Sequence, residues 1–144
     1  MYEKIIVIGS NSFSGASFVP SVIDAGFEVV GVSRSEEPNP VFLPYKYSGE
    51  GIEFHQLDLN HDLDKIMALI NSKKPEYVVN FSSQSMVAQS WDHPDHWFKT
   101  NVVSTIQFHD QLRHCDFLKK YVHISTPEVY GSCEGYIKES NSYY

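Results

Sequence analysis

The feature that most constrains this fold is an apolar, β-branched run followed at once by a glycine turn. Residues Lys4–Ile8 are nearly all apolar, which is typical of a strand buried on both faces of a parallel sheet. Gly9 ends this run, and Gly15 follows six residues later, where apolar residues begin to recur at helical spacing. A strand that turns into a helix through such glycines predicts a phosphate cradle at the helix start. The alternative is an ordinary strand-to-helix turn that holds no ligand.

The rest of the chain alternates predicted strands with predicted helices. Further strands are expected at residues 28–33, 52–57, 77–81 and 121–125. Helices are expected at residues 14–25, 62–72 and 95–113, with a proline-rich loop at residues 36–50. This order predicts an α/β fold with a Rossmann-type doubly wound parallel sheet of strand order 3-2-1-4-5. Ligands of such sheets bind outside the carboxyl ends of the strands, where the strand order reverses.

Net charge, apolar runs and cysteine spacing limit the kinds of partner and the cellular compartment expected for this protein. The formal net charge of −7 disfavours a nucleic-acid partner, because phosphates need a basic face. The apolar runs are too short to span a membrane, so no membrane partner is expected. Cys115 and Cys133 have neither metal-type nor redox-type spacing. With no signal peptide at the start, they predict reduced thiols in a cytoplasmic protein.

Four groups of residues at those carboxyl ends predict a dinucleotide site. In the first turn, the glycine bend and the free N–H groups at the helix start face a pyrophosphate. The residues of this turn that we assign to the cofactor are Gly9, Asn11, Ser12, Phe13 and Gly15.

The second group, Ser33 and Arg34, lies at the end of the second strand. An acidic residue at this position takes the ribose hydroxyls of NAD, whereas hydroxyls and a guanidinium suit the 2′-phosphate of NADP. We therefore expect NADP, with NAD as the alternative because Glu36 and Glu37 lie close by in the sequence. A solvated Arg34 without a ligand role is a further alternative.

The third group, Asp58 and Leu59, follows the third strand. The carboxylate is able to accept from the adenine amino group while Leu59 packs on the ring. The alternative is that Asp58 organises a turn or caps a helix.

The fourth group follows the last two strands, where small hydroxyl residues leave space beside a cofactor and supply donors. Its cofactor-binding members are Phe81, Ser82, Ser83 and Ser125. Thr126 and Glu128 come next and are the catalytic candidates, because a hydroxyl polarises a carbonyl and a carboxylate moves a proton. The alternative for Glu128 is a surface carboxylate.

The histidines predict no metal site. His93 and His96 are three residues apart, but Pro94 lies between them and no third ligand is apparent. Trp91 and Trp97 are expected to be packing residues.

Five stretches of the chain resemble the extended short-chain dehydrogenase/reductases, in their nucleotide-sugar epimerase/dehydratase branch. They occur in the family's order, cover nearly the whole chain, and lie at residues 8–15, 57–60, 80–87, 100–102 and 125–131. The last stretch is similar to that of sugar 4,6-dehydratases acting on dTDP-glucose or GDP-mannose. The resemblance implies that the cofactor oxidises C4 of the sugar, water leaves across C5 and C6, and hydride returns to C6.

The resemblance also implies individual roles. Thr126 would hydrogen-bond the C4 oxygen, and Glu128 would abstract the C5 proton. Gln84 and Ser85 would face the sugar, and Thr100 would line the cofactor with Ser82 and Ser83. The intact enzyme would bind a nucleotide sugar and form a homodimer in which the 95–113 helix takes part.

The chain departs from the family at several positions. Ser12 replaces a glycine, and Asn80 replaces the more usual histidine. Pro127 replaces an acidic residue of the dTDP-glucose enzymes, which favours a GDP-mannose-like arrangement or a different reaction. No tyrosine is followed four residues later by lysine, although the family uses such a Tyr-x-x-x-Lys pair.

These departures shape the expected domain organisation. We expect residues 1–144 to be the NAD(P)-binding domain of a larger enzyme, truncated before the substrate domain and inactive alone. The parent is expected to be a 4,6-dehydratase, with a 4-epimerase or reductase as the alternative. A non-catalytic NADP-binding module is the alternative from another class.

Overall fold

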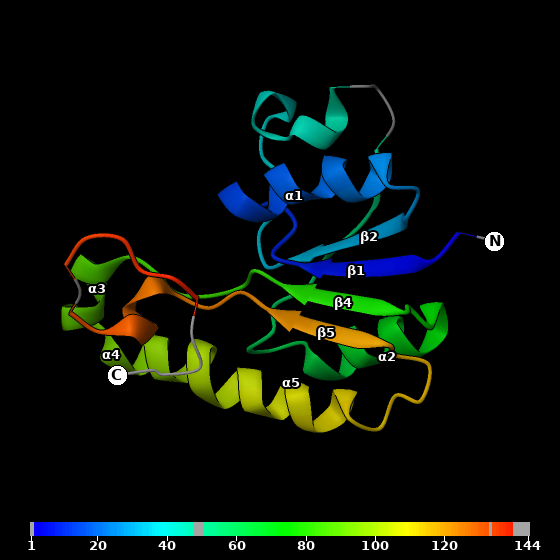
Figure 1. Ribbon diagram of the computed structural model, residues 1–144. Coiled ribbons are helices and arrows are strands. Elements are labelled where there is room, and N and C mark those ends of the chain that lie inside the picture. The colour runs from blue at the N-terminus through cyan, green and yellow to red at the C-terminus, as the bar shows by residue number, and fades with distance from the viewer. Residues whose placement is uncertain (1, 48–50, 133, 140–144) are drawn as a thin grey trace.

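Five parallel strands form the centre of the protein (Figure 1). The computed structural model describes residues 2–47, 51–132 and 134–139, so Cys133 lies outside the described part. The strands are β1 (Lys4–Ile8), β2 (Glu28–Ser33), β3 (Glu53–Gln56), β4 (Tyr77–Asn80) and β5 (Lys120–His123). Their order is β3-β2-β1-β4-β5, and each pairs in parallel with its neighbours. The predicted Rossmann-type order 3-2-1-4-5 is confirmed.

Helices cover both faces of the sheet (Figure 1). One face carries α1 (Phe13–Asp24), and the other carries α2 (Leu63–Lys73) and α5 (Thr105–Leu112). Because side chains alternate along a strand, Ile5 and Val7 pack in the α1-side core, while Ile6 and Ile8 pack with α2 and α5. All four side chains are buried, which explains why this strand is apolar at every position after Lys4.

The segment between β2 and β3 is more ordered than the predicted loop. It contains two short 3₁₀ turns, Pro40–Phe42 and Pro44–Lys46. Leu43 and Tyr45 are fully buried and join the α1-side core. This segment therefore covers part of the sheet with two large side chains instead of a long helix.

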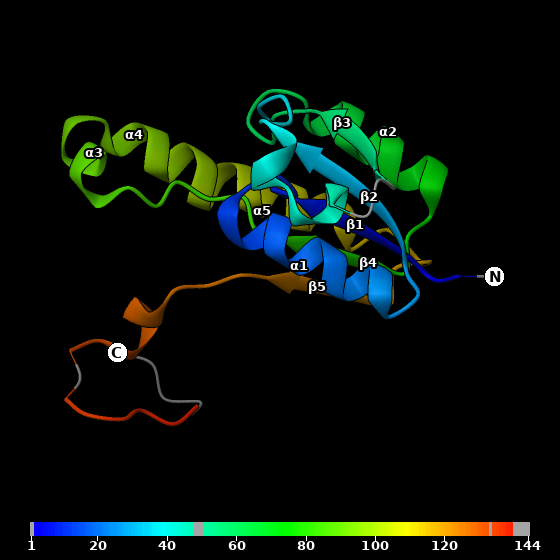
Figure 2. The ribbon, with the colours of Figure 1, turned by 90° about the horizontal axis from the view of Figure 1, so that it is seen from above.

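The predicted 95–113 helix is divided into three parts. They are α4 (Pro94–Trp97), a π-helical segment (Phe98–Ser104) and α5, and a further short helix, α3 (Val87–Asp92), precedes them. Figure 2 shows α3 and α4 extending beyond the sheet. In the described part of the chain, no helix is both long and apolar enough to cross a membrane.

Only some of this helix's apolar residues enter the core. Phe108 and Leu112 are buried, whereas Phe98 and Ile106 are 66% and 61% exposed. Val102 is also exposed, so one apolar stripe of the helical stretch faces solvent.

Candidate functional site

The glycine turn after β1 allows the backbone to pack closely on both sides. Gly9 has a φ of +80°, and a Cβ added there would lie 3.0 Å from the backbone of Phe81 and Ser82. A Cβ added at Gly15 would lie 2.1 Å from the Gly9 carbonyl oxygen. Both glycines are thus required by this backbone path, as a close helix-strand turn demands.

Ser12 caps the helix that follows. Its Oγ accepts a hydrogen bond from Gly15 N at 3.1 Å, and its carbonyl accepts from Ala16 N at 2.8 Å. Within the described residues, the N–H groups of Phe13 and Ser14 have no partner, and they lie at the positive end of the α1 dipole. The helix start therefore keeps two donors for an anion. The Ser12 cap was missed in the sequence, although a serine directly before a helix is its usual signal.

The end of β2 is braced against this turn. The buried Ser33 hydroxyl accepts a hydrogen bond from Asn11 N at 3.2 Å. The Asn11 side-chain Nδ2 donates to the carbonyls of Ser35 and Glu36, at 3.1 and 3.0 Å. These contacts hold the loop after β2 next to the glycine turn.

A first hollow lies at the carboxyl ends of β1, β2, β3 and β4. Its lining includes most of the residues predicted to bind the cofactor: Gly9, Asn11, Ser12, Ser33, Arg34, Asp58, Leu59, Phe81, Ser82, Ser83 and Thr100. Three predicted residues do not line it, namely Phe13, Gly15 and Ser125. The Phe13 side chain is 92% exposed, so only its backbone lies at the helix start.

Asp58 and Asn60 organise one wall of the first hollow. Asp58 Oδ1 accepts a hydrogen bond from Asn60 N at 2.8 Å, so the carboxylate stabilises a turn as well as lining the hollow. Asn60 donates from Nδ2 to Thr100 Oγ1 at 2.9 Å, and its Oδ1 accepts from Ser104 Oγ at 2.7 Å. Asn60 thereby joins the end of β3 to the π-helical segment. It was not predicted as a site residue, because its partners are forty or more positions away.

A second hollow lies beside the first, beyond the ends of β4 and β5. It brings together the predicted substrate residues, Gln84 and Ser85, and the predicted catalytic residues, Thr126 and Glu128. Ser125 lines this second hollow, and Trp97, predicted as a packing residue, also lies in its wall. Ser82 and Ser83 line both hollows, so the two are continuous at the end of β4.

Asn101 fixes the loop that carries Gln84. Its Oδ1 accepts from Gln84 N at 2.8 Å, and its Nδ2 donates to the Gln84 carbonyl at 2.9 Å. This two-point contact sets where the 82–85 segment lies between the hollows. Asn101 was missed because a side-chain clamp on a distant backbone leaves no local pattern.

A polar network runs from the buried Asn80, next to Ser82, to the exposed His123. Asn80 is fully buried, and its Oδ1 accepts from both the N–H and the hydroxyl of Ser82. Its Nδ2 donates to the Tyr121 hydroxyl at 3.1 Å, which lies 3.2 Å from His123 Nδ1. Burial and the nearby His109 lower the pKa of His123, while burial raises the pKa of Tyr121. Both groups are thus held neutral near pH 7.

The expectation of no metal site stays a prediction. A third potential ligand does accompany His93 and His96, because Asp95 brings a carboxylate next to both imidazoles. Pro94 does not separate the two histidines, since it begins α4 and the helix turn returns His96 to the side of His93.

The sheet order defines a Rossmann-type α/β protein, and its first hollow lies outside the strand carboxyl ends, where proteins of this class bind ligands. Within that class, the chain belongs to the GDP-mannose 4,6 dehydratase family, whose model matches residues 6–144.

Individual relatives include both dehydratases and epimerases. The chain is 26% identical over 137 residues to dTDP-glucose 4,6-dehydratase from Xanthomonas campestris pv. campestris (strain B100), covering 88% of this chain and 38% of that protein. It is 25% identical over 138 residues to UDP-glucose 4-epimerase from Mus musculus, covering 90% and 39%.

Solved structures share the fold. The UDP-glucose-4-epimerase from Stenotrophomonas maltophila, with bound NAD and formylated UDP-arabinopyranose, matches with a TM-score of 0.81 and 20% identity, covering 93% of this chain and 40% of that one. The chain therefore spans about two fifths of the length of these relatives.

Proposed function

We propose that this chain is the NAD(P)-binding part of a nucleotide-sugar 4,6-dehydratase. The observation that carries the proposal is the pair of adjoining hollows that share Ser82 and Ser83. A dinucleotide in the first hollow would end where a sugar in the second begins. Family membership and the dehydratase relatives support this reaction class.

The glycine turn suits a dinucleotide. A side chain at Gly9 would press on the Phe81 and Ser82 backbone, and the donors of Phe13 and Ser14 face outward from the helix start. Gly9 thus permits the tight turn that leads to the helix start, and the N–H donors there favour a pyrophosphate. When bound, the nicotinamide ring supplies the hydride acceptor and donor.

The end of β2 supports NADP as the cofactor. Ser33, Arg34 and Ser35 line the first hollow there. The Glu37 carboxylate is occupied elsewhere, since it accepts from Tyr45 OH at 2.8 Å and pairs with Lys46. The matched Stenotrophomonas epimerase was solved with NAD, so NAD is the alternative. A titration comparing both dinucleotides tests this choice, and an NAD preference would refute it.

In this proposal, the residues that line the second hollow carry out the chemistry. The Thr126 hydroxyl would donate to the sugar C4 oxygen, and the Glu128 carboxylate would take the C5 proton. Gln84 and Ser85, which line the same hollow, would orient the sugar, with the Gln84 backbone held by Asn101. Pro127 offers no proton, so protonation of the leaving hydroxyl would come from another group.

A 4-epimerase is the second candidate. The mouse relative and the Stenotrophomonas structure are both epimerases, and epimerisation also begins by oxidation at C4. A non-catalytic NADP-binding module is the third candidate.

The intact enzyme would be a homodimer. The exposed apolar stripe of Phe98, Val102 and Ile106 supports a subunit contact through the helical stretch that ends with α5.

A product assay separates these candidates. The parent protein that contains this chain is incubated with UDP-, GDP-, CDP- and dTDP-hexoses, and products are analysed by mass and NMR. Loss of water supports the dehydratase, inversion at C4 supports the epimerase, and cofactor binding without product supports the module. Residues 1–144 alone should bind dinucleotide without turnover.

Substitution of Glu128 sharpens the test. In the parent protein, Glu128→Gln should lower the dehydration rate by about 10²-fold or more, while the affinity for the dinucleotide stays unchanged. Glu134→Gln, at an exposed carboxylate outside both hollows, is the matched control. Equal rates for the two variants would remove Glu128 from the mechanism.

A further inference from the structure

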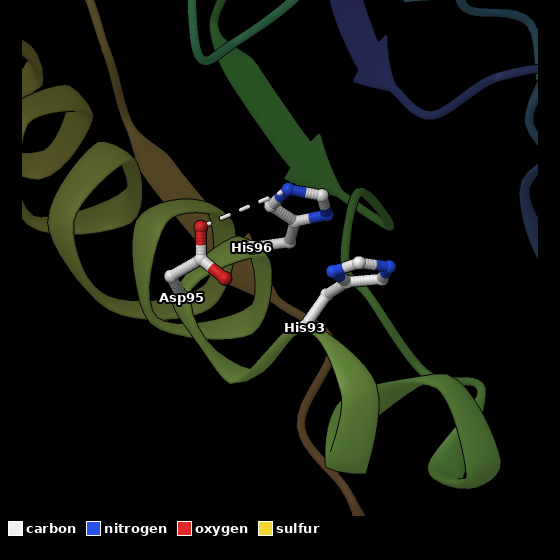
Figure 3. A group of neighbouring side chains, drawn as sticks. All are labelled: His93, Asp95 and His96. Carbon is white, nitrogen blue, oxygen red and sulfur yellow. Dashed lines mark ion pairs between the residues drawn. The ribbon is translucent and has the colours of Figure 1, made fainter.

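The corner between α3 and α4 places three metal-ligating side chains together (Figure 3). His93 is the last residue before Pro94, which excludes a helical backbone at His93 and leaves it at φ −136°, ψ 61°. Pro94 then starts α4, whose first turn carries Asp95 and His96. The chain therefore bends at His93 and brings the helix turn back beside it.

The three side chains already face one another. The rings of His93 and His96 are stacked, with centroids 5.0 Å apart and 15° between their planes. His96 Nε2 lies 3.7 Å from Asp95 Oδ2. One ligand atom from each residue lies within 4.8 Å of the others. In a tetrahedral site with bonds of about 2.1 Å, ligand atoms are about 3.4 Å apart, so only small side-chain rotations are needed.

Those rotations are sterically open. The side chains of His96 and Asp95 are 58% and 80% exposed, and His93 is exposed as well. Two imidazole nitrogens and one carboxylate oxygen suit Zn²⁺, which accepts this donor set with water in the fourth position. Ca²⁺ and Mg²⁺ prefer oxygen ligands throughout, so this set disfavours them.

We propose that His93, Asp95 and His96 bind one divalent transition metal ion, with Zn²⁺ as the best match. The ion joins the corner residue to the first turn of α4 and thereby fixes the α3–α4 corner. Helices of six and four residues are marginal by themselves, so a cross-link at their junction has a large effect on their order.

The corner also borders the second hollow. Val87 begins α3 and Trp97 ends α4, and both residues line that hollow. Metal binding at the corner therefore orders one wall of the hollow without occupying it. This site is independent of the proposed dinucleotide and sugar sites, so either proposal can fail without the other.

Calorimetric titration of the untagged chain with ZnCl₂ tests the site, with Co²⁺ absorption as a check on coordination. We expect one equivalent to bind. His93→Gln, His96→Gln and Asp95→Asn should each weaken binding by about tenfold or more, because losing a direct ligand costs at least as much as losing its supporting partner. His114→Gln, at an exposed histidine beside Cys115, is the control and should leave affinity unchanged.

Three outcomes would overturn the proposal. They are the absence of binding heat, an equal loss of affinity in His114→Gln, and full affinity in the His93→Gln, His96→Gln double variant. Hydrogen exchange supplies the second readout: Zn²⁺ should slow amide exchange in residues 87–97 of the wild type and not of the double variant. Zinc binding without this protection would contradict the proposal that the ion fixes the α3–α4 corner.

Discussion

Replacing Gly15 with alanine adds one methyl group at the tightest point of the glycine turn. The new Cβ would lie 2.1 Å from the Gly9 carbonyl oxygen and 3.0 Å from Ser12 Oγ. Non-bonded heavy atoms pack at about 3.5 Å, so α1 must move by roughly 1 Å or more away from β1. Overpacking lowers the free energy of unfolding by about 1–3 kcal/mol. The Gly9 carbonyl is part of the backbone and cannot rotate away, so we expect a loss of about 3 kcal/mol for Gly15→Ala. At roughly 2–4 °C per kcal/mol, Tm should fall by about 6–12 °C.

Urea and thermal unfolding of Gly15→Ala measure this loss, with Gly51→Ala as the matched control. Among the described residues, apart from Gly51 and its chain neighbours, no atom lies within 4 Å of a Cβ added at Gly51, so the control should stay within about 0.5 kcal/mol of the wild type. The displaced helix start should also weaken dinucleotide binding in Gly15→Ala. A free energy of unfolding within about 0.5 kcal/mol of the wild type would refute the close-packing argument.

Three further predictions concern stability. Ser12→Ala removes the N-cap of α1 and should lower the free energy of unfolding by about 1 kcal/mol, whereas Ser12→Gly should lower it by only a few tenths. Equal losses for the two variants in urea titrations would contradict the N-cap role of Ser12. Tyr45→Phe should cost about 1 kcal/mol, because its buried hydroxyl loses the Glu37 bond, and an unchanged Tm would contradict this. The pKa of His123 is lowered on folding, so the unfolded chain binds more protons and stability should fall as pH drops from about 6.5 through the folded pKa. Urea unfolding midpoints measured at several pH values test this, with His114→Gln as the control. His123→Gln should reduce the dependence of the midpoint on pH, and His114→Gln should not. An equal pH dependence in the two variants would contradict the role of His123.

Much of the fold follows from local patterns. After Lys4, every residue of β1 up to Ile8 is apolar because both faces of the strand are covered, and this pattern is visible in the sequence alone. The alternation of strands and helices, with right-handed crossovers, leaves few strand orders, and the predicted one was correct.

Several site residues were also accessible from the sequence. Residues at or just after the carboxyl ends of parallel strands lie at one edge of the sheet, which placed Ser33, Asp58 and Ser82 around one hollow. The roles assigned to Thr126 and Glu128 rest on resemblance, and their common position in the second hollow agrees with those roles without testing them.

Other features depended on contacts between distant segments. Leu43 and Tyr45 lie in a stretch rich in prolines, and their burial depends on the surface of α1 and the sheet. Asn60 and Asn101 act on partners seventeen to forty-four positions away, so no spacing rule reveals them. Asp95 was overlooked because the bend at Pro94, which brings it beside His93 and His96, was not considered.

The sequence by itself determined the strand order and the glycine turn, because burial periodicity and the need for residues without a Cβ are local properties. The tertiary structure decided how the strand ends combine into two adjoining hollows and which polar groups brace them. It also decided that Ser12 uses its hydroxyl to cap α1. The reason is physical: a hydrogen bond between distant segments has an energy only once the fold has paired its two ends.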